Sequence, residues 1–552
     1  MKMHMIEVAA IALAAAAFGA DVQTNGAPEI LGDLQERIDA LASGQLEARA
    51  LSATSAPPNY WCTWGGQGTT LHKVQKTEKA VFAGDQGVPL QRDNLNETVL
   101  FGEDGWATHF YPNNRAQLYL LLDAGWDLPY GTTTRGVKDL AMRGACIPHP
   151  DRFPSFKGSP AERLKALNEK VKSLGWRGIG VWIPAHVHGD MAEGRMLTDD
   201  EVRDVLADKM RLCRDAGVEY WKIDWGRRSN SVAFRRLMSE VRDKVYPGLI
   251  LEQCWVPGSP LNDVDRKHGC AQACNGRLLG NEAWCRNRKD HLAVMAASDV
   301  FRTYDVLFPF QYVTTLERCA YYSMVAEERN LPVLLNIEDA AVIGAGLGHV
   351  LGIMSSGATT NDHCVALAWQ KLAPPFGHDT GIRTRCSEEV LEDVWSYSDK
   401  DCSWFTGVAN KTVVQAAPAV VTRGLPLPEV KAEGPKPFVC GARYPNGALS
   451  LAFLPRVIGG KCRVDCLADV TLDAKLETGK PLGVFGRFRS LALKGGLAGG
   501  AHIQARQLPY GKARDVTALC TIGEDGSVTI PLAVFEKPQG DYTPNVVIEV
   551  VK

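Results

Sequence analysis

The sequence lacks an excess of charge of either sign and lacks long apolar runs. Its 61 basic and 63 acidic residues leave a net charge of −2, so it shows no sign of the strongly basic surface that nucleic-acid binding uses. No segment reaches the roughly 18 consecutive apolar residues of a membrane-spanning helix. We therefore expect no nucleic-acid partner and no membrane partner, and the sequence leaves the oligomeric state open.

Motifs for zinc and for dinucleotides are also lacking. Two C-x3-C pairs, Cys270/Cys274 and Cys462/Cys466, are not followed by the second Cys/His pair of a structural zinc site. They are local disulfide candidates in an exported protein, and most of the fifteen cysteines are expected to be small buried hydrophobes. No G-x-G-x-x-G segment favours a Rossmann sheet. We predict no metal and no cofactor.

The N-terminus has the pattern of a bacterial secretory signal. Met1 and Lys2 precede an apolar run at 8–17 and the small residues Gly19 and Ala20. Residues 1–20 are therefore expected to be a signal peptide, which predicts export to the periplasm or the extracellular space. Residues 21–58 are expected to form a helical extension, centred on 30–51, and a Ser/Ala/Pro linker.

Strands alternate with helices from residue 59 to residue 408. Capping boxes open two of the helices, at Ser159 to Glu162 and at Thr198 to Glu201, and Gly217 closes the second helix. Apolar segments are expected to form strands at 119–123, 177–183, 218–225, 249–255 and 332–337. Regular alternation over this length predicts an α/β fold with a (β/α)8 TIM barrel. Short β-prone runs between turn residues then predict a C-terminal antiparallel β-sandwich at 409–552.

Two charged residues interrupt the otherwise apolar and aromatic segment at 218–225. Lys222 and Asp224 lie two residues apart, so a strand would place them on one face. A buried carboxylate is costly unless it is paired or used. At the carboxyl end of a barrel strand, where catalytic side chains gather, Asp224 becomes a candidate catalytic residue. A structural ion pair lining the barrel is the alternative.

Six short segments then resemble, in their order, the clan D glycoside hydrolases, namely the α-galactosidases of families 27 and 36 with the raffinose-synthase branch. They are Tyr60-Trp-Cys-Thr-Trp64, Leu122-Asp-Ala-Gly-Trp126, Arg152-Phe-Pro154, Gly178-Ile-Gly-Val-Trp182, Trp221-Lys-Ile-Asp224 and Ala297-Ser-Asp299. The resemblance implies a retaining α-glycosidase with Asp224 as the nucleophile. It also implies that Lys222 keeps Asp224 ionised and binds a sugar hydroxyl.

The resemblance gives two candidates for the general acid/base. Asp299 in Ser298-Asp299-Val300 matches the family segment after strand six, although the arginine usually found before it is absent. Asp305 in Arg302-Thr-Tyr-Asp305 offers a competing R-x-x-D. We rank Asp299 first. Retaining glycosidases hold their two carboxyl groups about 5 to 5.5 Å apart, so distances to Asp224 in the tertiary structure can distinguish Asp299 from Asp305.

The same comparison suggests residues that contact substrate. Asp123 and Trp126 match a D-D-G-W motif that grips sugar hydroxyls, but Ala124 replaces the second acid, which argues against a plain terminal galactose. The other candidates are Trp64, Trp182, His186, Cys254 and Trp255. Structural packing is the alternative for the tryptophans, and a hydrogen-bonded structural role is the alternative for His186.

Four functions fit these observations. The first is an exported hydrolase acting on a carbohydrate substrate, either an oligosaccharide or a polysaccharide side chain. The second is a transglycosylase of the raffinose-synthase type, and the third is a carbohydrate-binding protein on a degenerate barrel. A lyase that forms a Schiff base on Lys222 is the most distant, because the neighbouring Asp224 would hold the lysine protonated.

Overall fold

The computed structural model describes thirteen segments of the chain. They are residues 56–68, 91–132, 137–255, 282–302, 311–354, 361–378, 381–396, 412–458, 461–464, 466–495, 501–509, 511–534 and 545–552. The expected signal peptide, the expected helix at 30–51 and the Cys270/Cys274 pair lie outside these residues, so those expectations stay predictions.

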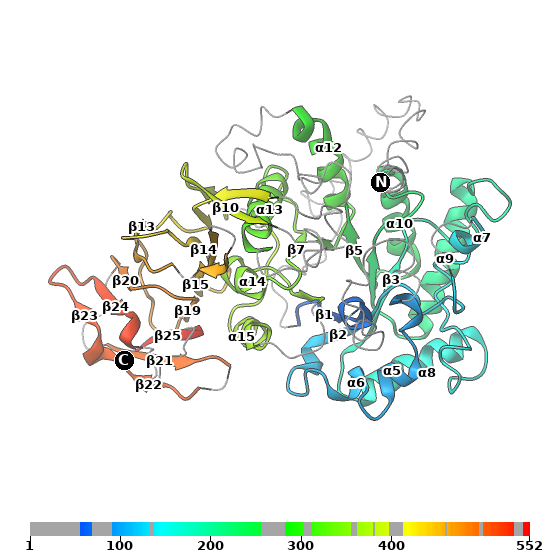
Figure 1. Cartoon of the computed structure of the whole chain (residues 1–552), viewed down its shortest axis with the longest axis horizontal. Helices are drawn as coiled ribbons and strands as arrows, with labels where there is room; N and C mark the ends of the chain where they lie inside the picture. The colour runs from blue at the N-terminus through cyan, green and yellow to red at the C-terminus, as the bar shows by residue number, and fades with distance from the viewer. Residues whose placement is uncertain are drawn as a thin grey trace.

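Eight parallel strands form the predicted barrel (Figure 1). Their bounds are β1 (Asn59–Cys62), β2 (Leu118–Leu122), β3 (Gly178–Ile183), β4 (Tyr220–Ile223), β5 (Ile250–Cys254), β6 (Val300–Arg302), β7 (Leu334–Asn336) and β8 (Gly352–Ile353). Neighbours pair in chain order from β1 to β7, and β1 also pairs with β8. A parallel bridge between Asn336 and Val350 joins the last two and closes the barrel.

Helices between these strands cover the outside of the barrel. The longer ones are α8 (Pro160–Ser173), α9 (Asp199–Asp215), α10 (Val232–Val245), α12 (Glu282–Ala296), α13 (Gln311–Glu327), α14 (Ala341–Leu347) and α15 (Asn361–Gln370), with short α5 (Glu97–Phe101), α6 (Trp106–His109) and α7 (Val137–Ala141). Both predicted capping boxes are present, at Ser159 and at Thr198. Gly217 has φ +67°, the left-handed conformation that turns the chain from α9 toward β4.

Alternate residues of the barrel strands point inward and form a core of their own. This interior cluster contains Tyr60, Cys62, Trp64, Tyr119, Leu121, Ala124, Trp182, Tyr220, Ile250, Val300, Leu334, Val350 and Met354. The other alternate residues pack against the helices in a separate core. Because strand side chains alternate between two faces, residues 220, 222 and 224 all face the interior, as the predicted pairing of Lys222 with Asp224 requires.

Two sheets follow the barrel. One has β9 (Thr384–Cys386), β12 (Val420–Arg423), β14 (Phe438–Arg443), β15 (Leu449–Leu454), β19 (Leu482–Phe485), β21 (His502–Gln507), β22 (Arg514–Asp515) and β25 (Asn545–Val551); the other has β13 (Glu429–Lys431), β18 (Asp469–Leu472), β20 (Ser490–Leu493), β23 (Thr521–Ile522) and β24 (Val528–Pro531). Two ribbons are formed by β10 (Val390–Ser396) with β11 (Thr412–Pro418) and by β16 (Arg456–Ile458) with β17 (Lys461–Val464). Leucines of both sheets, Leu451 and Leu491 among them, share one core, as in a sandwich.

The sheet region differs from its prediction in two respects. The pairs β12 with β14, β15 with β19 and β18 with β20 are parallel, so the sheets are mixed and not purely antiparallel. In addition, β9 pairs with β12 although it precedes the predicted boundary at residue 409. The region therefore begins earlier along the chain than the change in sequence texture indicated.

The barrel and the sheet region meet at α14, which lies against β14 and β15 in Figure 1. Tyr444 donates a 2.7 Å hydrogen bond to the carbonyl of Ala345, and Ser450 donates one of 2.7 Å to Gly346. A Cβ on Gly346 would lie 2.7 Å from Cys440 Sγ, so this close approach requires glycine. The sheet region thus packs against α14, the helix between the last two strands of the barrel.

Eight cysteines in the part of the chain that the structure describes are buried. Cys466 is one of these, and because the side chain of Cys462 lies outside the described part of the chain, the suggested Cys462/Cys466 disulfide stays a prediction. The burial of Cys466 agrees with the expectation that most cysteines act as small core residues. Among the described helices, none is both long and apolar enough to cross a membrane.

Candidate active site

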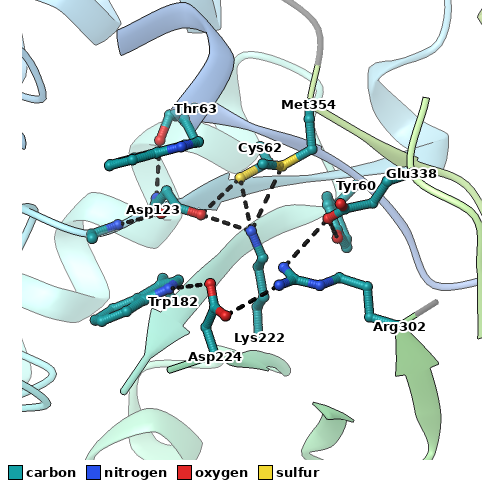
Figure 2. Close-up of polar contacts among 12 residues, drawn as sticks. Tyr60, Cys62, Thr63, Asp123, Trp182, Lys222, Asp224, Arg302, Glu338 and Met354 are labelled. Carbon is teal, nitrogen blue, oxygen red and sulfur yellow. Dashed lines mark hydrogen bonds and ion pairs between the residues drawn. The ribbon is translucent and has the colours of Figure 1, made fainter. Parts of the chain in front are cut away.

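Asp224 lies at the carboxyl end of β4, immediately after its last residue, Ile223. The strand register places Lys222 beside Glu252 of β5, and Cys254 of β5 beside Arg302 of β6. Continuing that register brings Asp224 to the level of Arg302 at the barrel mouth. Figure 2 shows both side chains pointing toward one another across the barrel interior.

Lys222 forms a buried ion pair with Asp123 and not with Asp224. Its Nζ lies 2.9 Å from Asp123 Oδ2 and also approaches the sulfur atoms of Cys62, at 3.7 Å, and Met354, at 3.6 Å. The Cys62 thiol donates to the same carboxylate oxygen over 3.0 Å. Burial, followed by the charge of Asp123, raises the pKa of the Cys62 thiol, so it stays protonated. The expected effect of Lys222 on Asp224 is therefore exerted through space.

Asp224 is held by two neighbours that differ in charge. Trp182 Nε1 donates to Oδ2 over 3.2 Å, and Arg302 Nη2 lies 3.2 Å from Oδ1 (Figure 2). Burial alone would raise the pKa of Asp224, but the charges of Arg302 and Lys222 outweigh burial and hold that pKa below its usual value. The carboxylate is thus ionised at neutral pH, as a nucleophile must be.

A second carboxylate network lies beside this pair. Arg302 Nη1 is 3.3 Å from Glu338 Oε1, which also accepts from the Tyr60 hydroxyl over 3.1 Å. That hydroxyl is 3.0 Å from Glu252 Oε1 and itself accepts from Asn336 Nδ2 over 2.9 Å. One phenol hydrogen can serve only one carboxylate. The hydrogen count is satisfied when Glu252 carries a proton, which agrees with the direction of its pKa shift, since burial raises it.

Asp299, ranked first as the acid/base, is not at this site, and that ranking is corrected. It precedes β6 by one residue and lies at the level of Leu251: its backbone N–H donates to the Leu251 carbonyl, and its carboxylate accepts from the Leu251 N–H. Its carboxylate forms an ion pair with Arg242 of α10, on the outside of the barrel. Three residues separate its level from that of Arg302, or about 10 Å along a strand. Asp305, the competing candidate, lies outside the described residues.

The predicted substrate contacts divide between the two faces of the barrel wall. Trp64 and Trp182 belong to the interior cluster, and Cys254 occupies the register position of Arg302. Trp126 and Trp255, in contrast, pack in the outer core with 0% and 2% of their surface exposed. Because both indoles pack in the outer core and not in the barrel-interior cluster, the expectation for these two tryptophans is corrected to core packing.

His186 has the structural role that was its alternative. Its Nε2 bonds to the carbonyl of Leu140 over 2.9 Å, and its Nδ1 accepts from the backbone N–H of Arg227 over 3.4 Å. Burial lowers its pKa to about 4, so the ring is neutral near pH 7. With both nitrogens bonded to backbone, His186 joins α7 to the loop after β4, and its predicted contact with substrate is corrected.

Sequence reasoning missed Arg302, Glu338 and Glu252 as members of the site. Glu252 lies in a predicted strand two residues before Cys254, and Glu338 directly follows the segment predicted as a strand at 332–337. Both positions carried a usable signal, because inward-facing acids near strand ends are candidates in a barrel. Within the described residues there is no group of three or more His, Cys, Asp or Glu side chains suited to a metal ion.

Comparison with known proteins gave only distant structural likenesses. No family model and no curated protein matches the chain. A β-L-arabinopyranosidase from Geobacillus stearothermophilus is 12% identical, with 66% of this chain and 95% of that chain covered and a TM-score of 0.34. An α-galactosidase from Saccharomyces cerevisiae is 10% identical, with 85% of each chain covered and a TM-score of 0.39. The functional proposal below rests on the site and its motifs.

Proposed function

We propose that the protein is a retaining α-glycosidase, α-galactosidase-like and exported, that cleaves α-linked sugars from oligosaccharides or polysaccharides. One observation carries the proposal: Asp224 is an ionised acid of the barrel interior that also reaches solvent. Its side chain is 14% exposed, compared with 5% for Asp123 and 0% for Glu338. A sugar at the mouth would therefore meet Asp224 first. The α-linkage and the galactose-like ring are inferred from the ordered motifs.

The chemistry follows from this placement. An oxygen of Asp224 attacks the anomeric carbon while the bond to the leaving oxygen breaks and an acid supplies that oxygen with a proton. The same group, now a base, removes a proton from water as water attacks the glycosyl ester and releases Asp224. Arg302 and the Trp182 N–H favour the ionised carboxylate, both before attack and after release.

Asp305 is the proposed acid/base, because Asp299 faces away from the barrel interior. It follows Arg302, the last residue of β6, by three positions. Catalytic side chains in such barrels come from strand ends and the loops after them. Glu338 is less suited to this role, since Arg302 and Tyr60 already hold it inside the barrel.

Covalent labelling at Asp224 tests the proposal. Incubation with an activated 2-deoxy-2-fluoro-α-galactoside should leave one glycosyl adduct, located by peptide mass spectrometry on Asp224. Asp224→Asn should lose the adduct and lower turnover of aryl α-galactosides by at least about a thousandfold. Asp299→Asn is the matched control and should retain labelling. Normal turnover by folded Asp224→Asn would reject the mechanism.

Two alternatives make different predictions. A transglycosylase would also form the adduct, but an added acceptor sugar would divert the product from free sugar to a new glycoside. A carbohydrate-binding protein, which the position of Asp299 and the presence of Ala124 favour, would bind sugars without forming an adduct. Product analysis with and without acceptor, together with the labelling result, separates the three.

A further inference from the structure

Two arginines lie beside Trp225, the residue that follows Asp224, and a third, Arg227, comes two positions later in the chain. Arg92 and Arg143 each place the guanidinium carbon over the ring of Trp225, at 5.8 and 4.9 Å from its centroid. Arg227 contributes its charge to the same region, because both it and Arg143 lower the pKa of the buried His186. We call Arg92, Arg143 and Arg227 the arginine cluster.

Arg92 is buried without an ion pair in the part of the chain that the structure describes. It is 2% exposed, and its Nε and Nη1 atoms have no hydrogen-bond acceptor among those residues. Burial lowers its pKa to about 9, which leaves the guanidinium charged at neutral pH. An unpaired buried charge is costly, so we expect a buried arginine of this kind to bind an anion or to act in function.

The nearest carboxylates already have partners. Asp123, whose charge acts on Arg92, is 2.9 Å from Lys222 Nζ, and Asp93 is 2.6 Å from Arg152. The residue after Asp123 is Ala124, so that turn adds no second acid. Asp127 and Asp139 act on Arg143 in turn, so among the described residues it is Arg92 that has no carboxylate of its own.

The cluster borders the proposed catalytic site through two indoles whose ring planes are tilted by 56°. The ring of Trp225 is 6.0 Å from that of Trp182, and Trp182 Nε1 donates to Asp224. Trp225 also packs against the barrel-interior cluster. A sugar bound at Asp224 would therefore have the arginines within reach of its ring substituents.

We propose that the arginine cluster binds an anionic group, a carboxylate or a sulfate, on the sugar that Asp224 attacks. This inference rests on the proposed function and narrows its substrate to acidic glycosides. A guanidinium presents paired N–H donors that match the oxygens of either anion, and Arg92 has two such donors without acceptors. The anion would supply the charge that Arg92 lacks.

Equilibrium binding tests the inference without requiring turnover. Calorimetric titration should show that galacturonate or galactose 6-sulfate binds at least about tenfold more tightly than galactose, the gain expected from hydrogen bonds to a charged group. Preference for galacturonate would identify a carboxylate substrate, and preference for the sulfate would identify a sulfated one. Equal affinity of the wild-type protein for all three sugars would overturn the inference.

Variants locate the effect. Arg92→Gln should lose the preference for the anionic sugar and keep its affinity for galactose, and Arg92→Lys should keep part of the preference, because the charge remains and the paired donors do not. Arg211→Gln, at an exposed arginine paired with Asp208, is the control and should behave as the wild type. An unchanged preference in folded Arg92→Gln would also reject the site.

Failure of this inference differs from failure of the proposed function. Labelling of Asp224 without any anion preference would remove only the arginine subsite. Anion preference without labelling, by the neutral reagent and by its galacturonate analogue alike, would leave the subsite standing and remove the glycosidase mechanism. The two experiments share no readout, so each result has one interpretation.

Discussion

Arg302 Nη2 lies 3.2 Å from Asp224 Oδ1, joining the ends of β6 and β4 across the barrel mouth. The second amino group of the same guanidinium lies 3.3 Å from Glu338 at the end of β7. Arg302 thus divides its charge between two acids, and Asp224 is stabilised as an anion without being neutralised by a dedicated partner. Such a carboxylate stays both ionised and available for attack.

Replacing Arg302 should therefore shift the acid limb of activity. In Arg302→Gln the charge that opposes burial is lost, so the pKa of Asp224 should rise and turnover should fall away at a higher pH than in the wild type. The measurement is kcat/KM against pH with an aryl α-galactoside. Arg302→Lys, which keeps the charge, should shift the limb less. An unchanged acid limb in Arg302→Gln would show that Arg302 does not control Asp224.

The Lys222 and Asp123 pair should couple strongly in stability. Lys222→Met leaves the Asp123 carboxylate buried without its cation, a change that typically costs about 3 to 5 kcal/mol. Asp123→Asn combined with Lys222→Met should recover part of that loss, because no charge remains. Urea unfolding of the two single variants and the double variant gives the coupling energy. If the two substitutions change the free energy of unfolding by strictly additive amounts, Lys222 and Asp123 do not interact.

Glu252 should make stability depend on pH in a direction opposite to that of an ordinary acid. Its native pKa is raised by burial, so between about pH 4.3, the unfolded value, and its native pKa the folded state holds a proton that the unfolded chain has released. Stability contributed by that proton is lost as pH rises through this window. Glu252→Gln has no such proton. The free energy of unfolding of the variant minus that of the wild type should therefore increase as pH rises through this window.

The measurement is the difference in free energy of unfolding between Glu252→Gln and the wild type as a function of pH. Glu169→Gln, at an exposed glutamate, is the matched control and should give a flat difference across the same range. A flat difference for Glu252→Gln as well would mean that Glu252 is ionised in the folded protein, and that Tyr60 satisfies the network in another way.

Substitutions of Asp299 and Asp305 should have different effects, the first on stability and the second on turnover. Asp299→Asn removes a charged partner of Arg242 and should lower stability by about 1 to 3 kcal/mol while leaving kcat close to that of the wild type. Asp305→Asn should slow natural α-galactosides by about a hundredfold or more, and aryl substrates with good leaving groups much less, because those need no proton. Steady-state kinetics on both substrate types checks this, and the reverse pattern would restore Asp299 as the acid.

Much of the barrel could be predicted, because its signals are local. Capping boxes at Ser159 and Thr198 and the left-handed Gly217 fix where helices begin and end, and the five strands with predicted bounds lie within two residues of the expected ranges. The mixed pairing of the C-terminal sheets was not predictable in this way. Which strands become neighbours depends on contacts between segments such as β12 and β14 that turn signals do not record.

The sequence by itself determined the order of strands and helices and brought Asp224 to the end of β4, because periodicity, caps and turns act over a few residues. Only the tertiary structure decided which acids share that end. Successive strand residues point to opposite faces, and the level of each depends on the register of its neighbours. Asp299, one residue before β6, consequently faces Arg242, whereas Arg302, three residues later, faces Asp224.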